Sequence, residues 1–163
     1  MTPILNHQDI QHKIRRIAYQ IYETNLDETQ IILAGINGNG FIFAEKLQII
    51  LSQISPIKVI LCKVNMNKKN PLEGTSTSVA PQQYENRVVV LVDDVLNSGQ
   101  TLIYGVKHFL EVPLKKLITA VLVNRNHKSY PIKADFKGIS LSTSMQEHIN
   151  VDFTEGNYIA YLQ

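Results

Sequence analysis

The stretch VVVLVDDVLNSGQT, residues 88 to 101, combines a strand pattern, two acids and a turn of small residues. Its first five residues are continuously apolar, which is typical of a strand buried on both faces of a parallel sheet. Asp93 and Asp94 follow that run, and Gly99 lies in the turn that opens the next helix. Ligands of open α/β sheets bind beside the carboxyl ends of the strands. The stretch therefore predicts both a fold class and the position of a site.

Apolar residues on both sides of this stretch follow strand and helix patterns in turn. Four further strands are expected, at residues 31–36, 58–64, 117–123 and 134–139. Helices are expected at residues 9–25, about 43–54 and about 101–110. Strands that alternate with helices indicate an α/β fold with a mostly parallel central sheet. Because no repeat or boundary interrupts the pattern, we expect residues 1–163 to form a single domain.

The composition is that of a globular protein of the cytoplasm. Hydrophobic residues make up 44% of the 163 residues and charged residues 18%, which excludes a disordered chain. The one cysteine, Cys62, leaves no disulfide framework, as expected in a reducing compartment. Apolar runs are too short for a membrane span, and the first residues lack the pattern of a signal peptide. The net charge of +2 suits an anionic ligand but does not by itself indicate nucleic acid.

Residues 65 to 87 differ from the rest of the chain. They are polar, contain two prolines and a glycine, and show no sustained apolar periodicity. A loop of this length inside a compact domain is either disordered or functional, often as a lid.

The residues from 93 to 101 suit a phosphate bound beside a sugar. Gly99 allows a tight turn and a close approach of the backbone to an anion. Main-chain amides of the turn and of the helix N-terminus favour negative charge, and the hydroxyls of Ser98 and Thr101 add donors. Asp93 and Asp94 can accept hydrogen bonds from sugar hydroxyls or hold Mg²⁺ through water. The alternative, a strand-end aspartate that caps the next helix, explains one acid and not the whole stretch.

The same stretch resembles the phosphoribosyl pyrophosphate motif of the type I phosphoribosyltransferases. That motif has four apolar residues, two acids, a short apolar pair and a small-residue loop ending in Gly-x-Thr, and all of it is matched. The segments IILAGINGNGFIFAEKL, RIAYQIYETN and LITAVLVNRNHKSYPIKADFKGISLSTS are similar to the PyrR group of pyrimidine-operon regulators and uracil phosphoribosyltransferases. The resemblance implies a type I phosphoribosyltransferase fold, with a central mostly parallel sheet flanked by helices and a small hood.

The resemblance also assigns residues to each part of the ligand. Asp93 and Asp94 are the implied catalytic and metal-holding acids, which would position the ribose and Mg²⁺ rather than act as acid and base. Phosphoribosyl pyrophosphate would be held by a phosphate loop (Val95, Leu96, Asn97, Ser98, Gly99, Gln100 and Thr101) and a pyrophosphate turn (Asn37, Gly38, Asn39 and Gly40). Phe136 would stack on the nucleobase, with Asn124 and Arg125 beside it. Ordinary core packing is the alternative for Phe136.

Three departures from the family pattern bear on activity. The pyrophosphate turn has only asparagine and glycine where the family usually carries lysine or arginine, which stabilise the leaving group. Lys68 and Lys69 in the polar segment are candidates to replace that charge. Asn124 stands where the PyrR group has aspartate, which leaves the identity of the base open. Asn97 stands where purine-using relatives have an aspartate as general base, and an amide cannot accept that proton.

The resemblance implies that ribosyl phosphate is transferred from phosphoribosyl pyrophosphate to a nucleobase, uracil first, with release of pyrophosphate. Two alternatives stay open: an RNA-binding attenuation regulator of pyrimidine genes, and a sensor that binds the diphosphosugar or a nucleotide without turnover. Arg15 and Arg16 match basic positions on the group's first helix and are candidate RNA contacts, although a charged helix face is ordinarily only solvated. The family also implies a homodimer or a higher homo-oligomer.

Overall fold

Two β-sheets with flanking helices make up the protein in the computed structural model, which describes residues 1–144 and 146–163. The larger sheet has six strands in the order β4-β3-β2-β5-β6-β7. These strands are β2 (Gln30–Ile36), β3 (Lys58–Met66), β4 (Thr75–Thr77), β5 (Val88–Leu96), β6 (Lys116–Arg125) and β7 (Phe136–Leu141). Neighbouring strands are parallel except for β3 and β4. The predicted α/β fold with a mostly parallel central sheet is confirmed.

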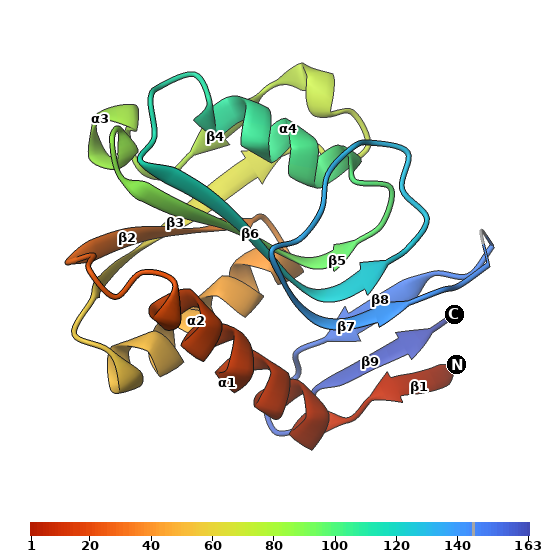
Figure 1. Ribbon diagram of the computed structural model, residues 1–163. Coiled ribbons are helices and arrows are strands. Elements are labelled where there is room, and N and C mark those ends of the chain that lie inside the picture. Colours follow the sequence, from red (N-terminus) through yellow and green to blue (C-terminus); the bar gives the residue numbers. More distant parts are fainter. Residues whose placement is uncertain (145) are drawn as a thin grey trace.

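Helices cover both faces of the six-stranded sheet. α1 (His7–Glu23) and α2 (Asn39–Ile54) lie on one face, and α3 (Pro81–Tyr84) and α4 (Gln100–Phe109) lie on the other (Figure 1). α1 begins with a capping box, in which the side chains of Asn6 and Asp9 each accept a hydrogen bond from the other's main-chain amide. Within the two described ranges, no helix has the length and hydropathy needed to cross a membrane.

The strand β5 is buried on both sides, which explains its continuous apolar run. Val88, Val90 and Val92 belong to the apolar cluster that includes residues of α1 and α2. Val89 and Leu91 belong to a second cluster, which includes residues of α4. Since successive side chains of a strand point to opposite faces, both faces of β5 need apolar residues. The same strand therefore fixes the centre of the sheet and carries Asp93 to its edge.

A three-stranded antiparallel sheet forms the hood implied by the resemblance. Its strands are β1 (Thr2–Leu5), β9 (Ile159–Leu162) and β8 (Ile149–Asp152), with β9 in the middle. The two chain ends consequently lie side by side (Figure 1). The hood is bonded to both helices of the adjacent face: the Tyr158 amide donates to His7 Nδ1 at 2.9 Å, and Lys46 Nζ donates to the Tyr158 hydroxyl at 2.8 Å. The sequence did not predict these three strands.

The polar segment of residues 65 to 87 has regular structure, so the expectation of a long structureless loop is wrong. After β3 ends at Met66, a short 3-10 helix η1 (Pro71–Glu73), β4 and α3 follow. Tyr84 is 1% exposed and packs edge-on against Phe109 of α4, with 4.9 Å between ring centres. Val79 and Tyr84 anchor the segment to the core beneath α4. Because these anchors are separated by polar residues, they give no periodic signal in the sequence.

Leu33 in β2 tests the position of the core, because its side chain is fully buried. Leu33→Ala should lower the free energy of unfolding by about 2–5 kcal/mol, since it removes buried methyl groups and leaves a cavity. Leu26→Ala makes the same change at a residue that is 64% exposed, and should alter stability by less than about 0.5 kcal/mol. Urea unfolding followed by circular dichroism measures both. Equal losses for the two variants would contradict this arrangement.

Candidate functional site

The carboxyl ends of the central strands meet at one edge of the six-stranded sheet, on the side of the hood (Figure 1). The pyrophosphate turn follows β2, Asp93 and Asp94 lie near the end of β5, and the phosphate loop leads from β5 into α4. β6 runs parallel to β5 and brings Asn124 opposite Leu96, so Arg125 ends at the same edge. Three segments that are far apart in the sequence thus meet where an α/β sheet binds its ligand.

Asp93 is the central acid of this edge. It is 4% exposed, whereas Asp94 is half-buried. Asp93 Oδ1 accepts a hydrogen bond from the Asp94 amide at 2.9 Å, and Lys68 Nζ lies 3.7 Å from the same oxygen. Burial, followed by the charge of Asp94, raises the pKa of Asp93 well above its ordinary value, while Lys68 opposes the rise. Ionised Asp93 is therefore unfavourable in the protein without a ligand.

Two glycines of the pyrophosphate turn explain how α2 packs so closely against this acid. A Cβ on Gly40 would lie 2.7 Å from Asp93 Oδ1 and 3.2 Å from the carbonyl oxygen of Val92, so a larger residue would push the helix away. Gly38 precedes α2 with a φ of +87°, a conformation that L side chains rarely adopt. The N-terminus of α2 is consequently directed at the carboxyl end of β5, with no side chain between them at Gly40.

The asparagines of the pyrophosphate turn hold neighbouring segments in place. Asn37 Oδ1 accepts a hydrogen bond from the Met66 amide at 3.2 Å, and the Asn37 amide donates to the Val64 carbonyl at 2.8 Å. Asn39 Nδ2 donates to the carbonyl oxygen of Val151 in β8 at 2.7 Å. The first residue ties the turn to β3, and the second ties it to the hood. Both side chains are thus already engaged within the protein.

The phosphate loop has the backbone shape expected for an anion site. Gly99 adopts a φ of +91° and caps α4, so the amides of the first turn of that helix face the loop. The Gln100 amide donates to Ser98 Oγ at 3.2 Å, which holds the hydroxyl inside the turn. A hollow of about 30 Å³ lies between Asp93, residues 95 to 102 and Val121. The loop therefore offers main-chain donors around a small space next to the acids.

The chain after β6 covers one side of the phosphate loop. The amides of Ser129 and Tyr130 donate to the Ser98 carbonyl at 2.9 and 3.1 Å. A Cβ on Gly99 would lie only 2.6 Å from the Cγ2 atom of Ile132, so glycine is required by this contact as well as by its φ angle. The shape of the phosphate loop thus depends on residues about 30 positions later in the chain.

Arg125 connects the phosphate loop to the segment after β7. Its guanidinium donates to Asn97 Oδ1 at 3.2 Å, to Thr143 Oγ1 at 2.8 Å and to the Ser144 carbonyl at 2.8 Å. All three acceptors are neutral, so these bonds leave the positive charge of Arg125 uncompensated at the edge of the site. Arg125 therefore lies between the phosphate loop and the segment after β7, and its contact with the base stays a prediction.

Asn124 is buried behind this arginine. It is 3% exposed, and its Nδ2 atom donates to Ser140 Oγ at 3.2 Å. Its Oδ1 atom has no hydrogen-bond partner among the residues that the structure describes. A buried carbonyl oxygen without a donor destabilises the folded state. The side chain thus lies at the edge, although its direct bond is to β7 rather than toward the phosphate loop.

Phe136 lies away from the site, and the prediction that it stacks on the nucleobase is wrong. It begins β7 and pairs with Ala120, whereas Ser140 of the same strand pairs with Asn124 at the carboxyl edge. The four intervening steps of strand correspond to about 13 Å. The Phe136 ring packs against the apolar cluster beneath α1 and α2. Core packing, the alternative given above, is therefore the role of this residue.

The two arginines proposed for RNA have different surroundings on α1. The guanidinium of Arg16 donates to the carbonyl oxygens of Lys137 and Gly138 at 3.1 and 2.8 Å, which ties α1 to the edge strand β7. The Arg15 guanidinium stacks on Tyr19 at 5.3 Å from the ring centre. Arg15 also lines a groove of about 330 Å³ between α1 and α2. Arg16 thus has a structural role, whereas Arg15 presents its charge to solvent.

Sequence reasoning missed three residues that support the site. Thr143 and Ser144 accept hydrogen bonds from Arg125, and the Val151 carbonyl accepts one from Asn39. Two of these contacts use main-chain oxygens, which carry no signature in the sequence. The only available signal was position, because Thr143 and Ser144 lie in the segment SLSTS that resembles the base-binding region of the PyrR group.

Comparison with known proteins identifies the class to which this site belongs. The phosphoribosyl transferase domain family matches residues 1–154. Solved structures of similar fold include a hypoxanthine-guanine phosphoribosyltransferase of Bacillus anthracis, with a TM-score of 0.78 at 19% identity over 100% of this chain and 98% of that one. The hypoxanthine phosphoribosyltransferase of Trypanosoma cruzi has a TM-score of 0.78 at 15% identity, over 99% and 96% of the two chains. The chain belongs to the phosphoribosyltransferase family.

Within that family, the chain is similar to several relatives that share one name. The chain is 34% identical over 145 residues to the "Bifunctional protein PyrR" of Streptococcus sanguinis, which covers 87% of this chain and 84% of the relative. It is 33% identical over 160 residues to the protein of the same name from Staphylococcus saprophyticus, covering 93% and 91% of the two chains. The resemblance to the PyrR group is thereby confirmed along most of the sequence.

The raised pKa of Asp93 predicts how stability depends on pH. In the unfolded chain this carboxyl titrates near pH 4, so its contribution to the free energy of unfolding should fall as the pH rises from about 4 through the higher folded-state pKa. Asp93→Asn removes that titration while keeping Oδ1. The variant should match the wild type in free energy of unfolding near pH 4 and be more stable than the wild type at pH 7.

Urea unfolding at the two pH values measures this difference. Asp27→Asn is the matched control, because Asp27 is exposed and the same substitution there removes a solvated charge. Its difference from the wild type should be similar at both pH values. An Asp93→Asn protein that is less stable than the wild type at pH 7 would contradict the burial of this acid.

Proposed function

We propose that the protein transfers ribosyl phosphate from phosphoribosyl pyrophosphate to a nucleobase, with uracil as the first candidate, and releases pyrophosphate. The observation that carries this proposal is the convergence of two helix N-termini on Asp93, one from the pyrophosphate turn and one from the phosphate loop. Helix N-termini and glycine-rich turns bind phosphate groups, and an acid between them suits a hydroxylated sugar. Membership of the phosphoribosyltransferase family supports the same ligand.

Each part of the site has a role in this reaction. The amides of the phosphate loop and the N-terminus of α4 bind the 5-phosphate, and Asp94, which is the more exposed acid, accepts hydrogen bonds from the ribose hydroxyls. The N-terminus of α2 faces the pyrophosphate, which approaches closely because Gly38 and Gly40 have no side chain. Both phosphate-binding ends are preorganised, so they stabilise charge that develops as the reaction proceeds.

The acids fit a magnesium ion that arrives with the ligand. Among the described residues there is no cluster of three or more histidine, cysteine or carboxylate side chains that could hold a metal alone. Mg²⁺ is commonly held by one or two carboxylates, several waters and the phosphates of the substrate, and Asp93 and Asp94 provide the carboxylates. When bound, Mg²⁺ would supply positive charge to the departing pyrophosphate.

In the transfer, the bond from C1 of ribose to the pyrophosphate oxygen breaks and the electron pair leaves with pyrophosphate. A new bond forms between C1 and a nitrogen of the base, and that nitrogen gives up its proton to water or to the released pyrophosphate. The transition state resembles an oxocarbenium ion. Arg125 and Asn97 lie 3.2 Å apart on the base side, where the guanidinium can donate to a carbonyl oxygen of the base. Asn97 cannot take a proton at neutral pH, which favours a pyrimidine over the purines of relatives with an acid there.

A second candidate function is RNA binding by the α1 surface. His12, Arg15 and Lys46 line the groove of about 330 Å³ between α1 and α2, and Lys46 is paired there with Glu155 at 3.7 Å. Basic side chains of this kind bind RNA phosphates. The curated relatives are named bifunctional, which is consistent with a second activity beside transfer. Arg16 contributes less to this candidate, because its guanidinium is bonded to β7.

Three further expectations belong to the same proposal. A homodimer or higher homo-oligomer is implied by the family resemblance. A cytoplasmic location is supported by the free, buried thiol of Cys62, which is compatible with a reducing compartment. A single domain over residues 1–163 is supported by the family match over residues 1–154. All three stay predictions.

Pyrophosphate release tests the enzyme. The pure protein is incubated with phosphoribosyl pyrophosphate, Mg²⁺ and each nucleobase in turn, and release with uracil is expected. Asp93→Asn combined with Asp94→Asn should abolish binding of the diphosphosugar, because both ribose-facing acids are lost, whereas Asp27→Asn should leave it unchanged. Calorimetric binding of the diphosphosugar without release for any base would overturn catalysis and establish a sensor. Unchanged affinity in the double variant would mean that the site is elsewhere.

A gel-shift titration tests the second candidate with a structured leader RNA. Arg15→Ala should weaken binding and reduce the slope of log affinity against log salt by about one, since one phosphate contact is lost. Lys58→Ala is the control, because Lys58 is an exposed lysine at the amino end of β3. Equal effects of the two substitutions would contradict a specific α1 surface. For Arg16→Ala, thermal unfolding is measured beside RNA binding, since this substitution also removes the bonds to β7.

A further inference from the structure

The residues of the pyrophosphate turn provide no positive charge to balance the negative charge of a bound pyrophosphate. Asn37 and Asn39 carry no charge, and their side chains are bonded to Met66 and Val151. The negative charge of Asp94 next to the turn makes this imbalance larger, because it repels an anionic group that approaches it. Pyrophosphate carries several negative charges, so main-chain dipoles alone give it weak stabilisation compared with a positively charged side chain.

Lys68 brings a positive charge to this place from the segment after β3. Its Nζ atom lies 3.7 Å from Asp93 Oδ1. A Cβ built on Gly38 would lie 4.0 Å from the same Nζ atom. The ammonium is therefore positioned above the pyrophosphate turn and beside the central acid. Its side chain is 39% exposed, so a ligand that enters the site can reach it.

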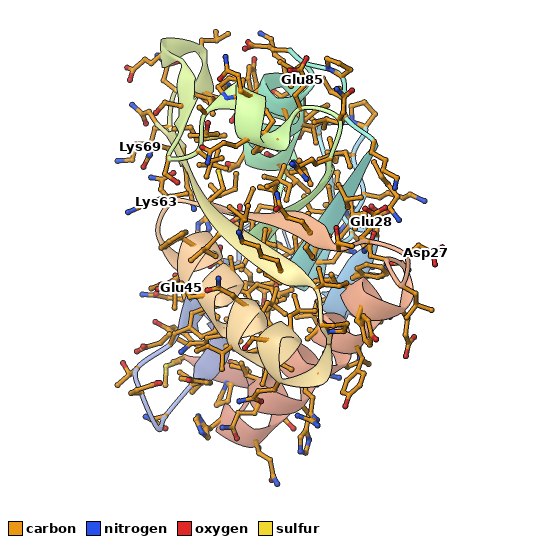
Figure 2. The ribbon with its side chains drawn as sticks, turned by 90° about the vertical axis from the view of Figure 1, so that its left-hand side faces the viewer. Asp27, Glu28, Glu45, Lys63, Lys69 and Glu85 are labelled. Carbon is orange, nitrogen blue, oxygen red and sulfur yellow. The ribbon has the colours of Figure 1, made fainter. Side chains whose placement is uncertain are left out.

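The backbone that presents Lys68 is held on both sides. Before it, the Met66 amide is bonded to Asn37 Oδ1 of the turn itself. After it, Asn67 Oδ1 accepts the amides of Lys69 and Asn70 at 3.0 and 3.3 Å, and Asn67 Nδ2 donates to Glu73 at 2.9 Å. These bonds make a tight turn in which Lys68 contacts the site, while the neighbouring Lys69 points away from the molecule (Figure 2).

The ion pair between Lys68 and Asp93 is long enough for the Lys68 ammonium to bind a second anion. Charged N–H···O hydrogen bonds are about 2.7–2.9 Å long, so a separation of 3.7 Å is an ion pair without a short hydrogen bond. An ammonium group has three donors, and one acidic neighbour leaves donors for a second anion. Lys68 can thus bind phosphate oxygens while it remains near Asp93.

We propose that Lys68 is the residue that binds the pyrophosphate group of the diphosphosugar, in place of the cations missing from the pyrophosphate turn. The inference rests on the proposed function, since it names a contact of the same ligand. It makes Lys68 a binding residue of the leaving group, whereas a purely structural Lys68 would only neutralise Asp93. The two roles differ in what they predict for pyrophosphate affinity.

Calorimetric titration with inorganic pyrophosphate in the presence of Mg²⁺ separates these roles without requiring turnover. Lys68→Met keeps the aliphatic stem and removes the charge, so pyrophosphate should bind roughly 10- to 100-fold more weakly. Lys69→Met is the matched control: it makes the same change at the next, outward-facing residue and should alter affinity less than about 2-fold. Lys68→Arg should retain most of the affinity, because it keeps a cationic donor at this position.

Thermal unfolding of all variants accompanies the titrations, and Lys68→Arg keeps the test valid if Lys68→Met does not fold. Wild-type affinity in Lys68→Met would overturn the proposal and leave the proposed function standing. Equal weakening by Lys68→Met and Lys69→Met would also overturn it, since only overall charge would then matter. If the wild type binds neither pyrophosphate nor the diphosphosugar, the proposed function itself fails. Weakening confined to position 68 and relieved by arginine supports Lys68 as the pyrophosphate ligand.

Discussion

The buried carboxyl group of Asp93 is the constraint around which the site is built. It lies at the end of the most apolar strand, with the first turn of α2 packed against it and a second carboxylate next to it. Such a group favours its neutral form unless a cation or several donors compensate its charge. The protein provides one hydrogen bond from the Asp94 amide and one distant ammonium, which is partial compensation. The remainder is left to the ligand.

The packing around this acid explains why small residues surround it. Gly40 lets the helix that follows β2 approach Asp93, and Gly99 lets the loop that follows β5 fit beneath Ile132. A side chain at Gly40 would push the start of α2 away from the acid, and one at Gly99 would push the loop away from Ile132. The asparagines of the pyrophosphate turn then fix its neighbours, β3 on one side and the hood on the other. The site is thus held by contacts from both sheets, and its geometry depends on the position of one sheet relative to the other.

The sequence predicted the features that depend on neighbouring residues, and it missed those that depend on residues far apart in the chain. The apolar run of β5, its two acids and the loop after it are local signals, so the sheet and the position of the turn between β5 and α4 were predicted closely. The position of Phe136 was predicted wrongly because the sequence of a strand does not reveal its register. The register, in which Phe136 pairs with Ala120, depends on the neighbouring strand β6. The contacts of Arg125 with Thr143 and Ser144 span about 20 residues and use small polar groups, so no local pattern announces them.

The pairing of β1 with β9 places the second residue of the chain beside the residue before the last. On a ribosome, β1 is made before every strand of the six-stranded sheet, whereas its partner β9 follows all of them. Closing so large a loop is entropically unfavourable until the intervening core has formed. The growing chain can therefore assemble the six-stranded sheet, and with it the N-termini of α2 and α4, before the hood exists. The carboxyl edge of the central sheet then takes shape before the hood docks onto α1 and α2.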